Sequence, residues 1–285
     1  MHRLTALRQP KYVMLYPLLS LMLIFLVFPT VYAWYLSFNR VYLATYSNPE
    51  FCGFKNFWDT LTDRNFYRSL SFTATFTVVV VSVELVLGIV LAVFFNRPIW
   101  GKRLWISLLL LPMMVSPALI GIMYRLMLNE FVGAIAFYLK GIKPLAPRWV
   151  VPTVMMIDIL QWTPFAFLII YATLQTVPKE LYEAAAIDGA GSFKKFLYIT
   201  IPSVLKMIVI TALFRCIDAF KTFDMIYVLT AGGPGTMTST LSIYIYKLAF
   251  QGGNIGRATA ASILLLLIFS IPMVFVLKRV IPREA

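Results

Sequence analysis

The stretch LSFTATFTVVVVSVELVLGIVLAVFF, residues 70–95, carries Glu84 as its single ionisable side chain. About 20 apolar residues in a helix cross the roughly 30 Å hydrocarbon layer of a membrane, so this run is long enough to span it. Five further apolar runs have similar length and fall at residues 13–36, 104–128, 150–174, 203–229 and 256–277. Pro112, Pro117 and Pro164 interrupt two of these runs. The sequence therefore predicts an all-α membrane protein, a polytopic bundle of six transmembrane helices.

The composition supports this class of protein and argues against several others. Hydrophobic residues make up 60% of the chain and charged residues 13%, whereas soluble domains are roughly half apolar and a quarter charged. The net charge of +13 does not indicate nucleic acid, because the basic residues flank apolar runs and form no Lys/Arg-rich block. His2 is the only histidine, and Cys52 and Cys216 are the only cysteines. The sequence therefore predicts no metal site, no disulfide framework and no catalytic triad.

An even number of spans places both termini on the same side of the membrane. With residues 1–12 and 281–285 assigned to the cytoplasm, the inner segments hold 12 Lys and Arg residues and the outer segments hold 10. The inner segments are shorter, so their density of positive charge is higher, as the positive-inside rule requires. The first run lacks a cleavage pattern and is interpreted as a retained span. Residues 13–280 are accordingly predicted to form the membrane domain.

The polar segment TVPKELYEAAAIDGAGSFKKFLYITIP, residues 176–202, separates the fourth and fifth runs. Pro178 suits the first turn of a helix, and acidic side chains near that turn favour the positive end of the helix dipole. Gly189 and Gly191 end this helix, and Ser192 can cap a second short helix before the next span opens. The pattern predicts a helix-turn-helix outside the membrane. Two interpretations stay open: its small-residue face docks on another protein, or the hairpin packs only on its own bundle.

This segment resembles the EAA loop of ABC importer permeases, the membrane subunits of ATP-driven uptake systems. The matching positions are Glu183, Ala184, Ala185, Gly189, Ile199 and Pro202. FCGFKNF at residues 51–57 resembles an external segment of carbohydrate permeases, and FDMIYVLTAGGPG at residues 223–235 resembles the Gly-Gly-Pro turn of maltose-type permeases. The chain thus resembles a carbohydrate importer subunit of a bacterial cytoplasmic (inner) membrane.

The resemblance implies a set of partners. It implies a second homologous permease subunit, two ATPase subunits and an extracytoplasmic sugar-binding protein, around a chain embedded in the lipid bilayer. ATP and Mg would be bound by the ATPase subunits, so this chain would hold no cofactor and no metal of its own. In this family the loop docks in a cleft of the ATPase. That docking would assign ATPase coupling to Glu183, Ala184, Ala185, Asp188, Gly189 and Ala190.

Ionisable residues at membrane depth gather in the fifth run, at Arg215, Asp218, Lys221 and Asp224. Each costs about 2.5–3.5 kcal/mol on insertion scales, so they are expected to face the bundle interior, a partner or water. A helical projection puts Arg215, Asp218, Ala219 and Thr222 on one face, Lys221 partly away and Asp224 nearly opposite. Either the first face lines a polar cavity, or the charges form an internal ion pair that holds helices together.

In the fourth run, Gln161 and Trp162 place a hydrogen-bonding group beside an aromatic platform of the kind on which sugars stack. Packing at an interface is the alternative for Trp162 and Phe165. The resemblance to maltose-type permeases implies a sugar site at Gln161, Trp162, Phe165, Arg215, Asp218, Ala219, Thr222 and Asp224. Two more acids within predicted spans, Glu84 and Asp158, are interpreted as packing or network residues.

No segment matches G-x-x-x-x-G-K-[ST], so the chain is not expected to hydrolyse ATP. Without a nucleophile–base pair or a metal set at membrane depth, it is not expected to be an enzyme of any other kind. We therefore predict a transport subunit for a sugar or related polyhydroxy compound, powered by separate ATPases. The alternative is an ion-coupled secondary transporter of a small polar solute, with Glu84, Asp158, Asp218 and Asp224 as a relay; no internal repeat supports it.

Overall fold

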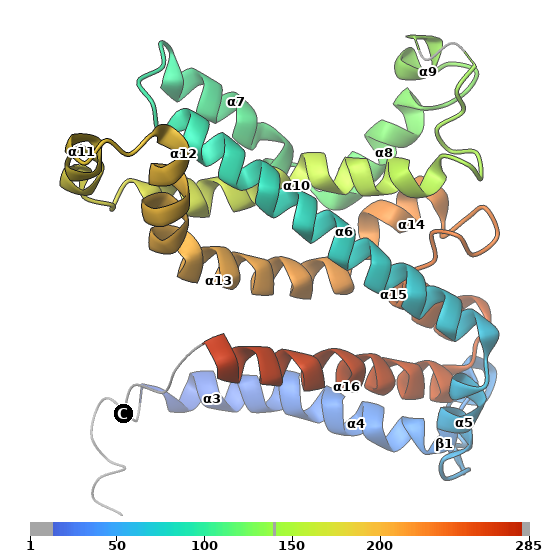
Figure 1. Cartoon of the computed structure of the whole chain (residues 1–285). Helices are drawn as coiled ribbons and strands as arrows, with labels where there is room; N and C mark the ends of the chain where they lie inside the picture. The colour runs from blue at the N-terminus through green and yellow to red at the C-terminus, as the bar shows by residue number, and fades with distance from the viewer. Residues whose placement is uncertain (1–13, 139–140, 281–285) are drawn as a thin grey trace, which may run out of the picture. The chain divides into compact units, whose positions relative to one another are not determined.

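The computed structural model describes residues 14–138 and 141–280, and almost all of its regular structure is helical (Figure 1). The chain forms two compact units. The first extends to Asp63 and includes Ile245–Ile268, and the second holds Arg64–Tyr244 and the chain from Phe269. The predicted cytoplasmic ends, residues 1–12 and 281–285, lie outside the described residues.

The first unit combines an apolar N-terminal helix, a small hairpin and the first half of the last helix. Its elements are α3 (Tyr16–Met22), a π-helical turn (Leu23–Val27), α4 (Phe28–Ser37), β1 (Asn39–Arg40), a 3-10 turn (Leu43–Thr45), β2 (Glu50–Phe51), α5 (Lys55–Leu61), a π-helical turn (Lys247–Gln251) and the start of α16 (Ile255–Val280). The strands pair antiparallel. The Asn56 amide donates to the carbonyl oxygens of Ser37 and Asn39, both at 2.9 Å, and so ties α5 to the end of α4.

The second unit is a helical bundle that contains the polar residues of interest. Its elements are α6 (Arg64–Phe95), α7 (Lys102–Met114), α8 (Pro117–Met127), α9 (Ala134–Tyr138), α10 (Val150–Leu174), α11 (Lys179–Ile187), α12 (Ser192–Lys195), a π-helical turn (Phe196–Thr200), α13 (Ile201–Phe220), α14 (Asp224–Thr230) and most of α15 (Leu241–Tyr246). Long α6 packs along α10 and α13. Fully buried Phe76, Val80, Val154 and Ile226 form part of the core between these helices and α14.

The helices α6 and α10 approach each other closely at Gly88. A Cβ atom at this position would lie 2.9 Å from the Ala166 Cβ and 3.0 Å from the Phe167 backbone nitrogen. Small residues of this kind let helix backbones pack tightly inside membranes. We expect Gly88→Leu to force the helices apart at a cost of about 1–3 kcal/mol of overpacking. Size-exclusion profiles of the fluorescently tagged protein should show loss of the folded peak.

Two graded controls accompany the Gly88 prediction. Gly88→Ala should lose less folded protein than Gly88→Leu, since it adds a single methyl group. Val90→Leu changes a side chain that is 58% exposed on the same helix and should leave the profile unchanged. A wild-type profile for Gly88→Leu would show that the close approach is not required.

Two of the six predicted spans differ in the structure from continuous helices. The run predicted at 104–128 is divided into α7 and α8, which bend by 94° at a break that follows Met114. The helix predicted at 203–229 ends at Phe220, and α14 begins only at Asp224. Neither Pro nor Gly occupies positions 221–223. The backbone oxygens of Lys221 and Thr222 instead accept hydrogen bonds from the hydroxyls of Ser242 and Thr240, at 3.1 and 3.0 Å.

The fifth span also starts earlier than predicted. The segment Ser192–Phe220 is one candidate membrane span of 29 residues, made of α12, the π-helical turn and α13. The expected separate second helix of the hairpin is therefore wrong, because it continues into the span. Pro202 lies in the first turn of α13, directly after the π-helical turn Phe196–Thr200. The wider π-helical turn joins α12 to α13 without ending the helix.

Candidate solute-binding site

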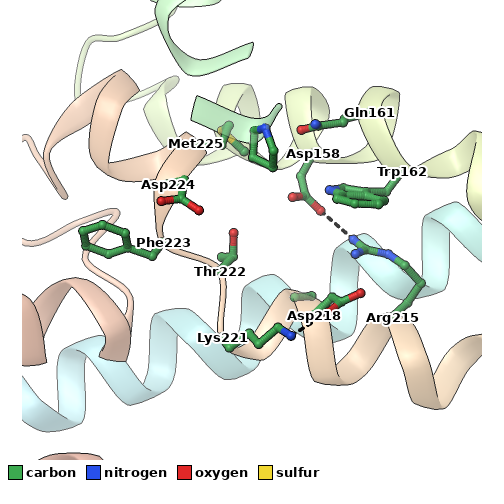
Figure 2. Close-up of a pocket in the computed structure, with 12 residues that line it drawn as sticks. Asp158, Gln161, Trp162, Arg215, Asp218, Lys221, Thr222, Phe223, Asp224 and Met225 are labelled. Carbon is green, nitrogen blue, oxygen red and sulfur yellow. Dashed lines mark hydrogen bonds and ion pairs between the residues drawn. The ribbon is translucent and has the colours of Figure 1, made fainter. Parts of the chain in front are cut away.

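A cavity of about 340 Å³ lies in the second unit, where the start of α8, the middle of α10 and the break after α13 meet (Figure 2). Its walls are formed by Pro117, Asp158, Gln161, Trp162, Arg215, Asp218, Ala219, Lys221, Thr222, Phe223, Asp224 and Met225. Small-molecule sites commonly enclose about 300–1,000 Å³. Carboxylates, amide and hydroxyl groups share these walls with aromatic rings, so the cavity can both hydrogen-bond and stack against a small polar solute.

The break after Phe220 decides which side chains reach the cavity. In a continuous helix Asp224 would lie nearly opposite the face that carries Arg215, Asp218 and Thr222, and Lys221 would turn partly away. Because the chain leaves the helix at Lys221 and restarts at Asp224, both residues line the same cavity as Asp218 and Thr222 (Figure 2). The projection was therefore wrong for Asp224 and Lys221. It was right to place Arg215, Asp218, Ala219 and Thr222 together.

Arg215 is the most heavily engaged residue of the cavity. Its side chain is 1% exposed, and its Nε and Nη2 atoms donate to the two oxygens of Glu84 at 2.7 and 2.9 Å. Nη2 also donates to the Asp158 Oδ2 atom at 3.0 Å. The three residues come from α13, α6 and α10, and all are buried. We call this set the buried triad. It has the form of the internal ion pair considered from the sequence, with partners on other helices.

Asp218 and Lys221 form a second, more exposed ion pair at the cavity edge. Their charged atoms lie 3.0 Å apart, with the side chains 42% and 65% exposed. Exposed pairs of this kind contribute at most about 1 kcal/mol to stability. Figure 2 shows this pair and the Arg215–Asp158 contact as two separate interactions. At three-residue spacing along this segment, Asp218 therefore pairs with Lys221 and not with Arg215.

α10 contributes the aromatic and amide groups of the site. The Arg215 guanidinium lies 4.9 Å from the centre of the Trp162 ring, a cation–π contact. The Gln161 amide nitrogen donates to the Val115 oxygen at 3.0 Å, at the bend between α7 and α8. Within the described part of the chain the Gln161 Oε1 atom is buried without a hydrogen-bond partner. Phe165, one residue after Pro164, does not line this cavity.

The hairpin that follows α10 carries the residues of the predicted coupling set. α11 contains Glu183, Ala184 and Ala185 and has no buried residue, so most of its surface is open. Asp188 ends the helix, and Gly189 follows with φ +73°, a conformation that glycine adopts without strain. The remaining residue of the predicted coupling set, Ala190, donates its backbone N–H to the Ala185 oxygen at 2.8 Å. The Tyr182 and Thr200 hydroxyls, 3.1 Å apart, link α11 to the base of the fifth span.

Sequence reasoning missed four wall residues of the cavity: Pro117, Lys221, Phe223 and Met225. It also assigned Asp158 to a network only, whereas Asp158 both joins the buried triad and lines the cavity. Pro117 carried a signal, since a proline inside an apolar run marks a break. Lys221, Phe223 and Met225 carried no such signal in the sequence, because they reach the cavity only through the break after Phe220.

Comparison with known proteins gives consistent matches. A family model described as "Binding-protein-dependent transport system inner membrane component" matches residues 84–285. The chain is 33% identical to the trehalose/maltose transport system permease protein of Thermococcus litoralis, over 93% of this chain and 91% of that protein. It is 32% identical to the trehalose transport system permease protein of Mycobacterium tuberculosis, over 90% of this chain and 84% of that protein.

A solved structure shares the fold. A chain from the crystal structure of a bacterial alginate ABC transporter, in complex with an alginate pentasaccharide-bound periplasmic protein, matches with a TM-score of 0.82. The two chains are 23% identical, and the match covers 94% of each. The arrangement of helices that builds the cavity therefore belongs to a known fold.

Proposed function

The chain belongs to the family of binding-protein-dependent transport system inner membrane components, and from this premise we propose that it imports a sugar or related polyhydroxy compound. It does so as one membrane-spanning subunit of an ATP-driven transporter. As a permease it is a transport subunit and not an enzyme. The observation that carries the choice of solute is the cavity, because it sets an aromatic ring among amide, hydroxyl and carboxylate groups. Sugars need this combination, since their C–H faces stack while their hydroxyls exchange hydrogen bonds.

Within the cavity we assign complementary roles to the wall residues. Trp162 provides the stacking surface, and Gln161, Thr222 and Asp224 provide acceptors for sugar hydroxyls. Gln161 supports this assignment, because its buried oxygen has no partner among the described residues and a solute hydroxyl would satisfy it. Asp218 completes the wall beside Ala219, whose small side chain leaves room for the solute.

The partners follow from the family. A second homologous permease would complete the pore, two ATPase subunits would bind ATP and Mg, and an extracytoplasmic sugar-binding protein would deliver the solute. Both termini would lie in the cytoplasm, on the same side as α11. The exposed helix α11, with Glu183, Ala184 and Ala185, would dock on one ATPase subunit. This proposal uses the small-residue face, which permits close approach of another surface.

The fifth span gives this docking a route to the cavity. Helical structure continues from Ser192 next to the hairpin to Phe220 at the cavity, so Ser192 and Arg215 are joined by about 35 Å of helix. A helix of this kind moves as a unit, and movement of α11 would therefore shift Arg215 and Asp218. Closure of the ATPases would in this way convert the cavity from outward-facing to inward-facing.

Uptake by the complete transporter in proteoliposomes tests the proposed function. We expect uptake of radiolabelled trehalose or maltose to require ATP and to be insensitive to ionophores. Ionophores would instead stop uptake by an ion-coupled transporter. Asp218→Ala should weaken the ATP hydrolysis that the binding protein stimulates, or raise the solute concentration needed for half-maximal uptake. We expect a change of about tenfold, because the variant loses roughly one hydrogen bond between a charged group and the solute. The control is Glu50→Ala, which removes an exposed acid of the β1–β2 hairpin. If Asp218→Ala lowers only expression, with uptake per molecule intact, the residue serves packing alone.

A further inference from the structure

The buried triad contains more acid than base. Glu84 and Asp158 both bond to Arg215, so two carboxylates face one guanidinium. Glu84 lies behind Arg215 and does not line the cavity, whereas Asp158 and Arg215 line it together with Asp218, Asp224 and Lys221. The triad and the other charged wall residues together hold four carboxylates and two cations, a formal charge of −2. Among the described residues that line the cavity, each of the two cations is already paired with an acid.

The triad leaves Arg215 one free nitrogen. A guanidinium has five N–H groups, of which one on Nε and two on Nη2 are used by the carboxylates. Nη1 has no hydrogen-bond partner among the residues that the structure describes. The bidentate contact with Glu84 fixes the guanidinium plane, which also holds it against Trp162 at 4.9 Å. The two carboxylates therefore compensate the positive charge of Arg215, while its Nη1 group can still donate hydrogen bonds to a solute.

We propose that Glu84 is a positioning residue that, together with Asp158, acts through Arg215 to make this cavity select an uncharged solute and reject an acidic one. The inference rests on the proposed function and narrows its solute class. A carboxylate-bearing sugar would enter a site with excess negative charge and no unpaired cation. In a protein interior a unit charge acts strongly over several ångströms, since the effective dielectric constant is about 20. An uncharged sugar meets no such barrier and can use Nη1 and the Trp162 ring.

A thiol placed in the cavity measures its electrostatic potential whatever the natural solute is. Thr222→Cys, made after Cys52 and Cys216 are replaced by serine, puts that thiol on the cavity wall. The complete transporter is treated with trimethylammonium-ethyl and sulfonatoethyl methanethiosulfonate, reagents of similar size and opposite charge. The ratio of their rate constants is divided by the same ratio for free cysteine. We expect the cationic reagent to be favoured by about tenfold or more.

Glu84→Gln then tests the triad itself. The substitution keeps the shape of the side chain and leaves a one-to-one Arg215–Asp158 pair, so the charge rises by one unit. We expect the preference for the cationic reagent to fall by about three- to tenfold. Asp158→Asn should act in the same direction and serves if Glu84→Gln fails to assemble. Asp63→Asn removes an acid from the Arg257 pair of the other unit and should leave the ratio unchanged.

Two results would overturn the inference. One is a ratio near unity in the parent protein, which would mean that the cavity carries no excess negative charge. The other is a ratio that neither Glu84→Gln nor Asp158→Asn changes. Both measurements are independent of sugar uptake, so failure of the proposed function and failure of this inference can be told apart.

Discussion

Replacing Arg215 by methionine is expected to abolish assembly of the transporter. The substitution removes the cation that bonds to Glu84 and Asp158, which are 0% and 3% exposed, and leaves these two carboxylates buried without it. Breaking a buried ion pair by removing one partner costs about 3–5 kcal/mol. Native proteins are stable by only about 5–15 kcal/mol, so this loss is a large share of the total. Size-exclusion chromatography of the solubilised complex should therefore show the variant aggregated or absent.

A compensated variant separates stability from transport in this experiment. Replacing a whole buried charge set by neutral residues of similar shape is often neutral or stabilising. We therefore expect Glu84→Gln and Asp158→Asn, added to Arg215→Met, to restore much of the assembled complex. Uptake should stay low, because the donor on Nη1 and the cation–π contact with Trp162 are still missing. Assembly of Arg215→Met at wild-type level would show that the triad does not stabilise the fold.

Reversing the charge of Glu183 is expected to abolish ATP-coupled uptake while the protein still inserts and assembles its own fold. Glu183 is exposed on α11, so we expect Glu183→Lys to leave the packing of this chain intact. An acid on a docking helix is expected to meet a basic residue of the ATPase partner. Disrupting one partner of an interface charge pair costs about 2–5 kcal/mol, which weakens docking by about 30-fold or more. Co-purification of the ATPase subunits and uptake in proteoliposomes should both fall.

The hairpin offers a graded series for this prediction. Glu183→Gln removes the charge without reversing it and should give an intermediate loss. Glu50→Lys makes the same reversal at an exposed acid in the β1–β2 hairpin, where it should have no effect on the ATPase. Unchanged uptake by Glu183→Lys would rule out the docking role of this residue. Loss of the folded permease itself would instead point to a structural role for α11.

The membrane class and the hairpin could be predicted from sequence because both depend on local patterns. Apolar runs long enough to cross a bilayer predict spans whatever their neighbours are, and the run at 70–95 indeed lies within one long helix, α6. The start of α11 after Pro178 and its end before Gly189 follow from turn chemistry within a few residues. The candidate site was predicted largely by resemblance, and the structure brings seven of those eight residues to one cavity and leaves out Phe165.

Only the tertiary structure decided how the charges are paired and where the fifth helix breaks. Arg215 meets Glu84 and Asp158 across 131 and 57 positions of sequence, so a helical projection of the fifth run could not show this pairing. The break after Phe220 is stabilised by the hydroxyls of Thr240 and Ser242, about 20 residues further along the chain. A backbone carbonyl needs a partner, but the local sequence does not say which one. The length of the apolar runs and the local turn residues therefore determined the helices, while contacts between distant residues determined the chemistry of the cavity.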